Sequence, residues 1–120
     1  MDARLKKLTE ICAELPEAER VVHAPHAQFK VRRRTFAYFL DDHHGDGIVA
    51  VTCKAPGSRP QALIDANPGG RFYLPAYLGP RGWVALRLDR DDVDWTEVAD
   101  LVVESYVQVA PKRLAAQVAR

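Results

Sequence analysis

The sequence predicts an α+β fold: a two-layer sandwich in which an antiparallel sheet carries the N- and C-terminal helices on one face. Three observations favour it. The chain begins and ends with segments whose apolar residues recur at helical spacing. Between them lie short apolar segments separated by short polar turns, which are typical of antiparallel hairpins. The length of 120 residues fits one domain, 1–120, that buries a core without disulfides.

The first helix is expected over residues 2–15, with Asp2 as its N-cap and Pro16 at its end. Apolar residues at helical spacing form its buried face: Leu5, Leu8, Cys12 and Leu15. A short second helix is expected over residues 60–66, with Ser58 as a candidate N-cap.

The last long helix has the clearest start signal in the chain. Asp94 and Glu97 have the spacing of a capping box, and Val93 and Val98 that of a hydrophobic staple. Pro111 then breaks the helix, and residues 112–114 begin a short helical tail.

Strands are expected at residues 20–24, 28–32, 35–41, 48–53 and 83–88. In the third, Phe36, Tyr38 and Leu40 stand at alternate positions and are expected to share one face. Arg33-Arg34 is the expected tight connection before that strand. An aromatic segment, 71–77, leads to the turn Gly79-Pro80-Arg81-Gly82, which holds Arg81 at its tip.

The charge is nearly balanced overall but unevenly placed. The net charge is +1, whereas proteins that hold nucleic acid by bulk charge are usually more basic. Four of the 17 basic residues lie between positions 30 and 34, and seven of the 16 acidic residues lie between positions 89 and 104. One end of the fold is therefore expected to be basic and another acidic.

The two cysteines, Cys12 and Cys53, belong to apolar segments and have no metal-ligand spacing. No secretory signal follows Met1, and no apolar run approaches the length of a membrane span. We therefore expect a cytoplasmic protein that does not act at a membrane.

Three longer stretches carry a family resemblance: residues 26–31 leading to 35–37, residues 73–84, and residues 104–114. With these motifs the chain resembles the MmcQ/YjbR family. The resemblance implies a helix-flanked antiparallel sheet similar to the frataxin-like arrangement, and a DNA-binding function based on a proposed double-wing shape. Family members often place glycine and lysine in the hairpin where this chain has Arg33 and Arg34, so the turn here is more basic and less flexible.

The leading functional hypothesis is that basic hairpin tips contact the phosphate backbone of double-stranded DNA. The candidate nucleic-acid-binding residues are Lys30, Arg32, Arg33, Arg34, Arg81, Lys112 and Arg113. The alternative interpretation is a solvated hairpin whose arginines deter pairing at the sheet edge.

A second hypothesis is a small-ligand or protein-interaction module without catalytic activity. Its pocket would be lined by the aromatic residues Phe72, Tyr73, Tyr77 and Trp83, although such a cluster is more often core. The chain contains no catalytic motif, so we expect no enzyme activity and no cofactor. The histidines of the turn after residue 41 stand at consecutive positions, which rarely converge on one ion, so we also expect no metal.

Overall fold

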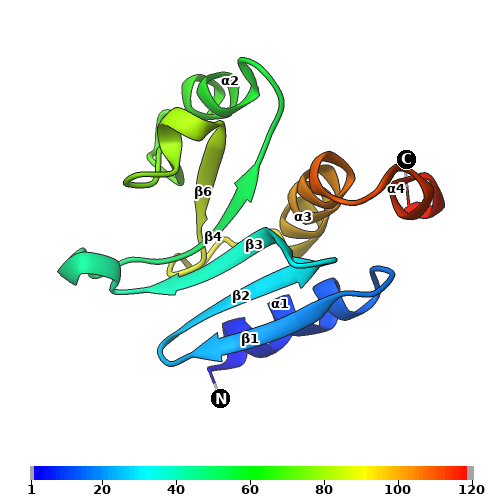
Figure 1. Ribbon diagram of the computed structural model, residues 1–120. Coiled ribbons are helices and arrows are strands. Elements are labelled where there is room, and N and C mark those ends of the chain that lie inside the picture. Colours follow the sequence, from blue (N-terminus) through cyan, green and yellow to red (C-terminus); the bar gives the residue numbers. More distant parts are fainter. Residues whose placement is uncertain (1, 119–120) are drawn as a thin grey trace.

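The computed structural model describes residues 2–118 and contains one six-stranded antiparallel sheet with four α-helices (Figure 1). The strands are ordered β1-β2-β3-β4-β6-β5. The elements in chain order are α1 (Ala3–Ala13), β1 (Glu19–His23), β2 (His26–Val31), β3 (Arg34–Asp41), η1 (His43–Gly45), β4 (Val49–Lys54), α2 (Arg59–Ala66), β5 (Phe72–Tyr73), η2 (Gly79–Arg81), β6 (Trp83–Arg87), α3 (Trp95–Val109) and α4 (Lys112–Val118). The predicted α+β fold is thus confirmed.

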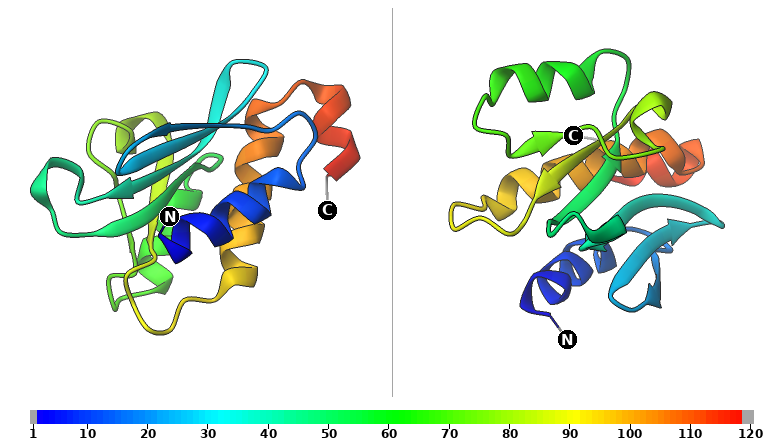
Figure 2. Two further views of the ribbon diagram at one scale, coloured as in Figure 1. Left: turned by 90° about the horizontal axis from the view of Figure 1, so that it is seen from below. Right: turned by 90° about the vertical axis from the view of Figure 1, so that its left-hand side faces the viewer.

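The helices gather on one side of the twisted sheet, with α3 between α1 and α2 (Figures 1 and 2). The core forms between α1, α3 and the sheet, and its members include Leu8, Phe29, Val51, Val84 and Val102. The opposite side of β2, β3 and β4 carries Lys30, Tyr38 and Lys54, all half-buried. We call this side the open face.

The predicted alternation along β3 is wrong because the strand contains a β-bulge. Phe29 pairs with Ala37 and Lys30 pairs with Thr35, which leaves Phe36 without a partner in β2. Phe36, Ala37 and Phe39 are therefore buried, whereas Tyr38 and Leu40 are half-buried.

Ser105 joins β3 and β4 at the point where their pairing stops. Ala37 and Cys53 form the last pair of this ladder, and beyond it β3 and β4 no longer pair with each other. The Ser105 hydroxyl donates to the Phe36 carbonyl oxygen at 2.5 Å and accepts from the Lys54 backbone N–H at 2.9 Å. Since Ser105 is fully buried, it satisfies two backbone groups that water does not reach.

The helix ends agree with the sequence at α3 and differ at α2. Asp94 caps α3 by accepting from the backbone N–H groups of Thr96 and Glu97. The Glu97 carboxylate contacts Arg71 instead of completing the capping box, and Ser58 makes no side-chain bond at the start of α2. Within residues 2–118, no helix is both long and apolar enough to cross a bilayer.

Both cysteines are buried in the core, as expected from the pattern, and both are free thiols. Burial raises the pKa of the Cys12 and Cys53 thiols above the ordinary value. Neither sulfur is therefore a reactive thiolate near neutral pH.

The Ser105 bridge makes a testable contribution to stability. Ser105→Ala leaves a buried N–H and a buried carbonyl unpaired, so we expect the free energy of unfolding to fall by about 3 kcal/mol in urea denaturation. Thr52→Val is the matched control, because the buried Thr52 hydroxyl has no hydrogen-bond partner among the described residues. We expect this variant to be as stable as the parent or up to about 1 kcal/mol more stable. Equal losses in the two variants would contradict this account of the bridge.

Candidate nucleic-acid interface

The hairpin between β2 and β3 presents two arginines at its tip. Val31 pairs with Arg34, so the two-residue turn is Arg32-Arg33, one residue earlier than predicted. Both turn residues have positive φ, 48° and 70°, as in the primed turns that match the twist of a hairpin. Glycine or asparagine usually occupies such positions, so both arginines adopt a backbone conformation that costs energy for an L-residue.

Arg32 is held by an acidic neighbour. Its guanidinium donates to both carboxylate oxygens of Glu17, at 2.6 and 2.9 Å, in an exposed pair. The hydrogen bonds from Arg32 hold the pKa of Glu17 below its ordinary value. Arg32 is thus a predicted hairpin cation that already forms a salt bridge in the structure.

Three other cations meet around one opening, which we call the cationic hollow. Its volume is about 280 Å³, and its lining residues are Arg34, Thr35, Tyr38, Lys54, Leu78, Arg81, Trp83 and Val109. The hollow brings together Arg34 and Arg81, which the sequence had suggested as separate contact points. It adds Lys54, which sequence reasoning missed. Among the described residues, none of its three cations forms a salt bridge.

Each cation of the hollow is positioned by a different element. Arg34 begins β3, while Lys54 ends β4 with its backbone N–H bound to Ser105. Arg81 lies in η2, where its backbone N–H donates to the Leu78 carbonyl at 2.9 Å. Gly82 ends that turn with φ of 87°, a conformation that glycine adopts without strain.

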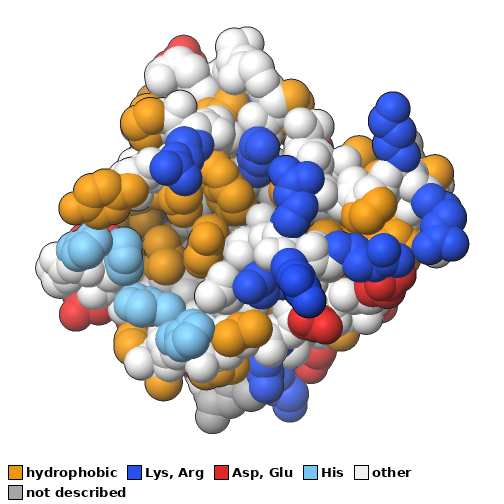
Figure 3. Space-filling model, viewed as in Figure 1, with side chains coloured by type: hydrophobic (Ala, Val, Ile, Leu, Met, Phe, Trp, Pro, Cys, Tyr) orange, Lys and Arg blue, Asp and Glu red, His pale blue; other side chains and the backbone are white. Residues whose placement is uncertain are grey.

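The remaining predicted cations lie around the hollow and the hairpin. Lys30 pairs with Thr35 on the open face, and Lys112 and Arg113 are exposed at the start of α4. Figure 3 shows Lys and Arg side chains gathering on this side of the molecule, from the region of β6 across the middle of the sheet to α4. We call this set the basic band: Lys30, Arg33, Arg34, Lys54, Arg81, Lys112 and Arg113.

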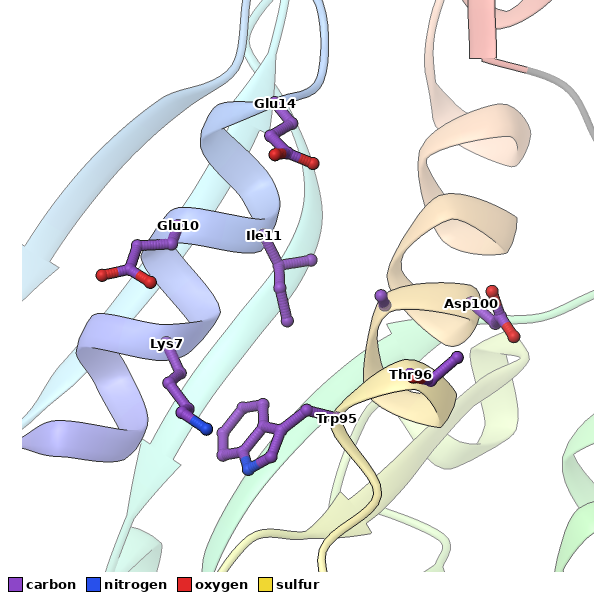
Figure 4. A pocket seen from close by; sticks show the side chains of 8 residues that line it. Lys7, Glu10, Ile11, Glu14, Trp95, Thr96 and Asp100 are labelled. Carbon is purple, nitrogen blue, oxygen red and sulfur yellow. The ribbon is translucent and has the colours of Figure 1, made fainter.

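Three acidic residues lie on a different surface, along α3. Glu97 and Glu104 pair with Arg71 and Arg59 in salt bridges. A larger hollow of about 430 Å³ lies between α1 and α3, lined by Lys7, Glu10, Ile11, Glu14, Trp95, Thr96, Ala99 and Asp100 (Figure 4). Its one cation lies over an aromatic ring, with Lys7 Nζ 5.3 Å from the Trp95 ring centroid. Three carboxylates against one ammonium make this hollow unsuited to an anion.

Two of the four aromatic residues of the alternative hypothesis, Phe72 and Trp83, line different hollows. Phe72 is buried against the core, Tyr73 is half-buried, and burial raises the Tyr73 pKa to about 12. Tyr77 is 77% exposed, and its ring meets that of His44 with 5.6 Å between centroids. Trp83 alone among them lines the cationic hollow.

His26, His43, His44 and Tyr77 form a chain of ring contacts, and Figure 3 shows histidine side chains gathered on one side of this face. The His43 ring lies 5.4 Å from that of His26 and 4.0 Å from that of His44. Burial, together with these two imidazoles, lowers the His43 pKa, so this ring is neutral near pH 7. Over residues 2–118, no three His, Cys, Asp or Glu side chains converge as metal ligands would.

Comparisons with known proteins agree with this architecture. A sequence model of the YjbR family matches residues 13–108, most of the chain. The crystal structure of the Deinococcus radiodurans protein DR2400, which carries a DUF419 domain, superimposes with a TM-score of 0.70 at 24% identity. That alignment covers 87% of this chain and 76% of the other, and it shows a shared fold. No curated protein matches the sequence. Since the matched segment includes every strand and most of α3, this chain belongs to the YjbR family.

Proposed function

We propose that this protein binds double-stranded DNA by contacting the phosphate backbone with the basic band. One observation supports the proposal above the others: within residues 2–118, Arg34, Lys54 and Arg81 line one hollow that no carboxylate lines, and none of the three forms a salt bridge. A nearly neutral protein attracts a polyanion only if its charges are separated in this way. Arginine guanidinium groups also give directional bonds to phosphate oxygens.

The shape of the surface fits a backbone contact better than base reading. Arg33 is exposed at the hairpin tip, Arg81 in the η2 turn and Lys112 at the start of α4. Separate cationic points of this kind suit phosphates spaced along a strand, which position a protein on DNA without reading its sequence. Both cysteines are free, which supports a reducing compartment such as the cytoplasm for this activity.

Salt dependence of duplex binding tests the proposal. We expect fluorescence anisotropy with a labelled duplex to show affinity that falls with salt, at a log–log slope of about −3 to −4 for roughly four phosphates. Replacing both Arg33 and Arg34 by alanine is expected to flatten the slope by about 2. Lys6→Ala with Lys7→Ala is the matched control, because it removes the same charge from α1. Absence of salt-sensitive binding at low ionic strength, or an equal loss in the control, would overturn the proposal.

Two substitutions of Arg33 separate the effect of its charge on duplex binding from the effect of its backbone conformation on stability. Arg33→Gly removes a cation and relieves the positive φ, so we expect weaker duplex binding together with an increase of about 0.5 to 1 kcal/mol in the free energy of unfolding. Arg33→Ala also removes the cation but keeps the Cβ atom at that φ. Its affinity should match that of Arg33→Gly without the gain in stability. If the more stable variant bound as well as the parent, Arg33 would not be a contact residue.

A substitution at Glu17 is expected to strengthen duplex binding instead of weakening it. Glu17→Gln removes the carboxylate that holds Arg32, which then adds a free cation beside the hairpin tip. We expect tighter duplex binding and a steeper salt slope, by about 1, in the same anisotropy assay. Glu10→Gln on α1 is the control with the same charge change, and it should leave the slope unaltered. An unaltered slope in Glu17→Gln as well would show that Arg32 takes no part in binding.

A further inference from the structure

We infer that the cationic hollow is a binding site for a phosphate monoester, in addition to its place in the basic band. The inference does not depend on duplex binding, since it rests on three cations and two aromatic rings that line a single opening, and on a buried hydroxyl of the strand residue paired with one of those rings.

The hollow brings three positive charges together, and a bound anion would reduce the repulsion between them. Arg34, Lys54 and Arg81 all line it, and no carboxylate does. Like charges around one concave opening repel each other, and a concave wall screens them from water more than a flat surface does. The backbone holds each of them by contacts that need no ligand, namely β3 pairing, the Ser105 bond and the η2 turn. The backbone positions of the three cations are therefore fixed without a ligand.

A lining residue of the hollow, Tyr38, pairs across the sheet with a residue whose buried hydroxyl has no hydrogen-bond partner among the described residues. Tyr38 and Trp83 both line the hollow, with their ring centroids 5.5 Å apart. Thr52 pairs with Tyr38 across the ladder and, two residues from Lys54 on the same strand, faces the same side. Its hydroxyl is fully buried and has no hydrogen-bond partner among the described residues. A buried hydroxyl without a partner is rare, and it requires an explanation such as a ligand or a water molecule.

Charge and shape favour a monoester over other anions. A phosphate monoester carries about two negative charges near pH 7, and three positive charges surround the hollow. Only one of its oxygens bears a substituent, so the group can enter a concave site with the rest of the molecule outside. A phosphodiester carries one charge and has two substituents that must both leave the opening. The same chemistry occurs at the phosphorylated end of a nucleic-acid strand and in small phosphorylated metabolites.

Trp83 reports directly on the hollow. The sequence has two tryptophans, so Trp95→Phe leaves Trp83 as the single indole fluorophore. In that background, inorganic phosphate and glycerol 3-phosphate are titrated at constant ionic strength, with chloride and glycerol as the respective blanks. We expect a saturable change in Trp83 fluorescence with both phosphates and none with the blanks. The inference would be overturned if neither inorganic phosphate nor glycerol 3-phosphate gave a saturable change in Trp83 fluorescence.

Variants identify the groups responsible. Lys54→Met and Arg81→Met should each weaken phosphate binding by about tenfold or more, as expected for the loss of one charge-assisted hydrogen bond. Thr52→Val should weaken it about threefold while leaving the unfolding transition in place. Lys7→Met, in the hollow between α1 and α3, is the matched control and should leave binding unchanged. Unchanged affinity in both Lys54→Met and Arg81→Met would overturn the assignment.

A last comparison separates the two sources of ligand and the two proposals. A short single strand with a 5′-phosphate is compared with its 5′-hydroxyl twin by the same fluorescence. Tighter binding of the phosphorylated strand alone supports a strand end as the ligand, and equal affinity of glycerol 3-phosphate supports a small metabolite. Phosphate binding without salt-sensitive duplex binding would leave this site standing and remove the proposed DNA function. Salt-sensitive duplex binding without any phosphate response would support the DNA function and overturn the phosphate site.

Discussion

The shape of the cationic hollow depends on two hydrogen bonds of the buried Ser105 hydroxyl. The bulge at Phe36 lies where the pairing between β3 and β4 ends, and the serine bonds to one backbone group of each strand at that point. An unpaired end would otherwise expose polar backbone inside the core. Because β3 and β4 stop pairing there, Arg34 and Lys54 line an opening beside α3, whose Val109 closes one side. The cationic hollow thus lies where the β3–β4 pairing ends, and Ser105 of α3 bonds the backbone groups left unpaired there.

The separation of charge follows from the same layered arrangement. The helical layer brings its own compensating arginines, since Arg59 and Arg71 pair with Glu104 and Glu97 of α3. Around the hollow, by contrast, the cations have no carboxylate beside them. A net charge of +1 is therefore compatible with a local group of cations that no carboxylate compensates at the hollow. Long-range attraction of an anion depends on this local field more than on the total charge.

The sequence predicts the elements of this fold better than it predicts their junctions. Capping at Asp94 and the helical spacing of Leu5, Leu8 and Cys12 depend on neighbours a few residues away, and both are confirmed. The bulge at Phe36 and the two-residue strand β5 depend on distant partners, so no local pattern shows them. The bond of Arg32 to Glu17 joins residues 15 positions apart and was missed for the same reason. The position of Lys54 could have been predicted from the sequence. It follows Thr52 by two positions at the end of an apolar strand, so both side chains lie on the open face.

The most direct test is a map of where phosphate acts on the protein. Two-dimensional amide NMR of the ¹⁵N-labelled protein, titrated with inorganic phosphate at constant ionic strength, reports on every element at once. The account predicts saturable shifts confined to the amides of Arg34, Thr35, Lys54 and Arg81 and to the Trp83 indole, with α1 unmoved. Shifts that centre on Lys7 and Trp95, or that grow without saturation over the whole surface, would contradict it.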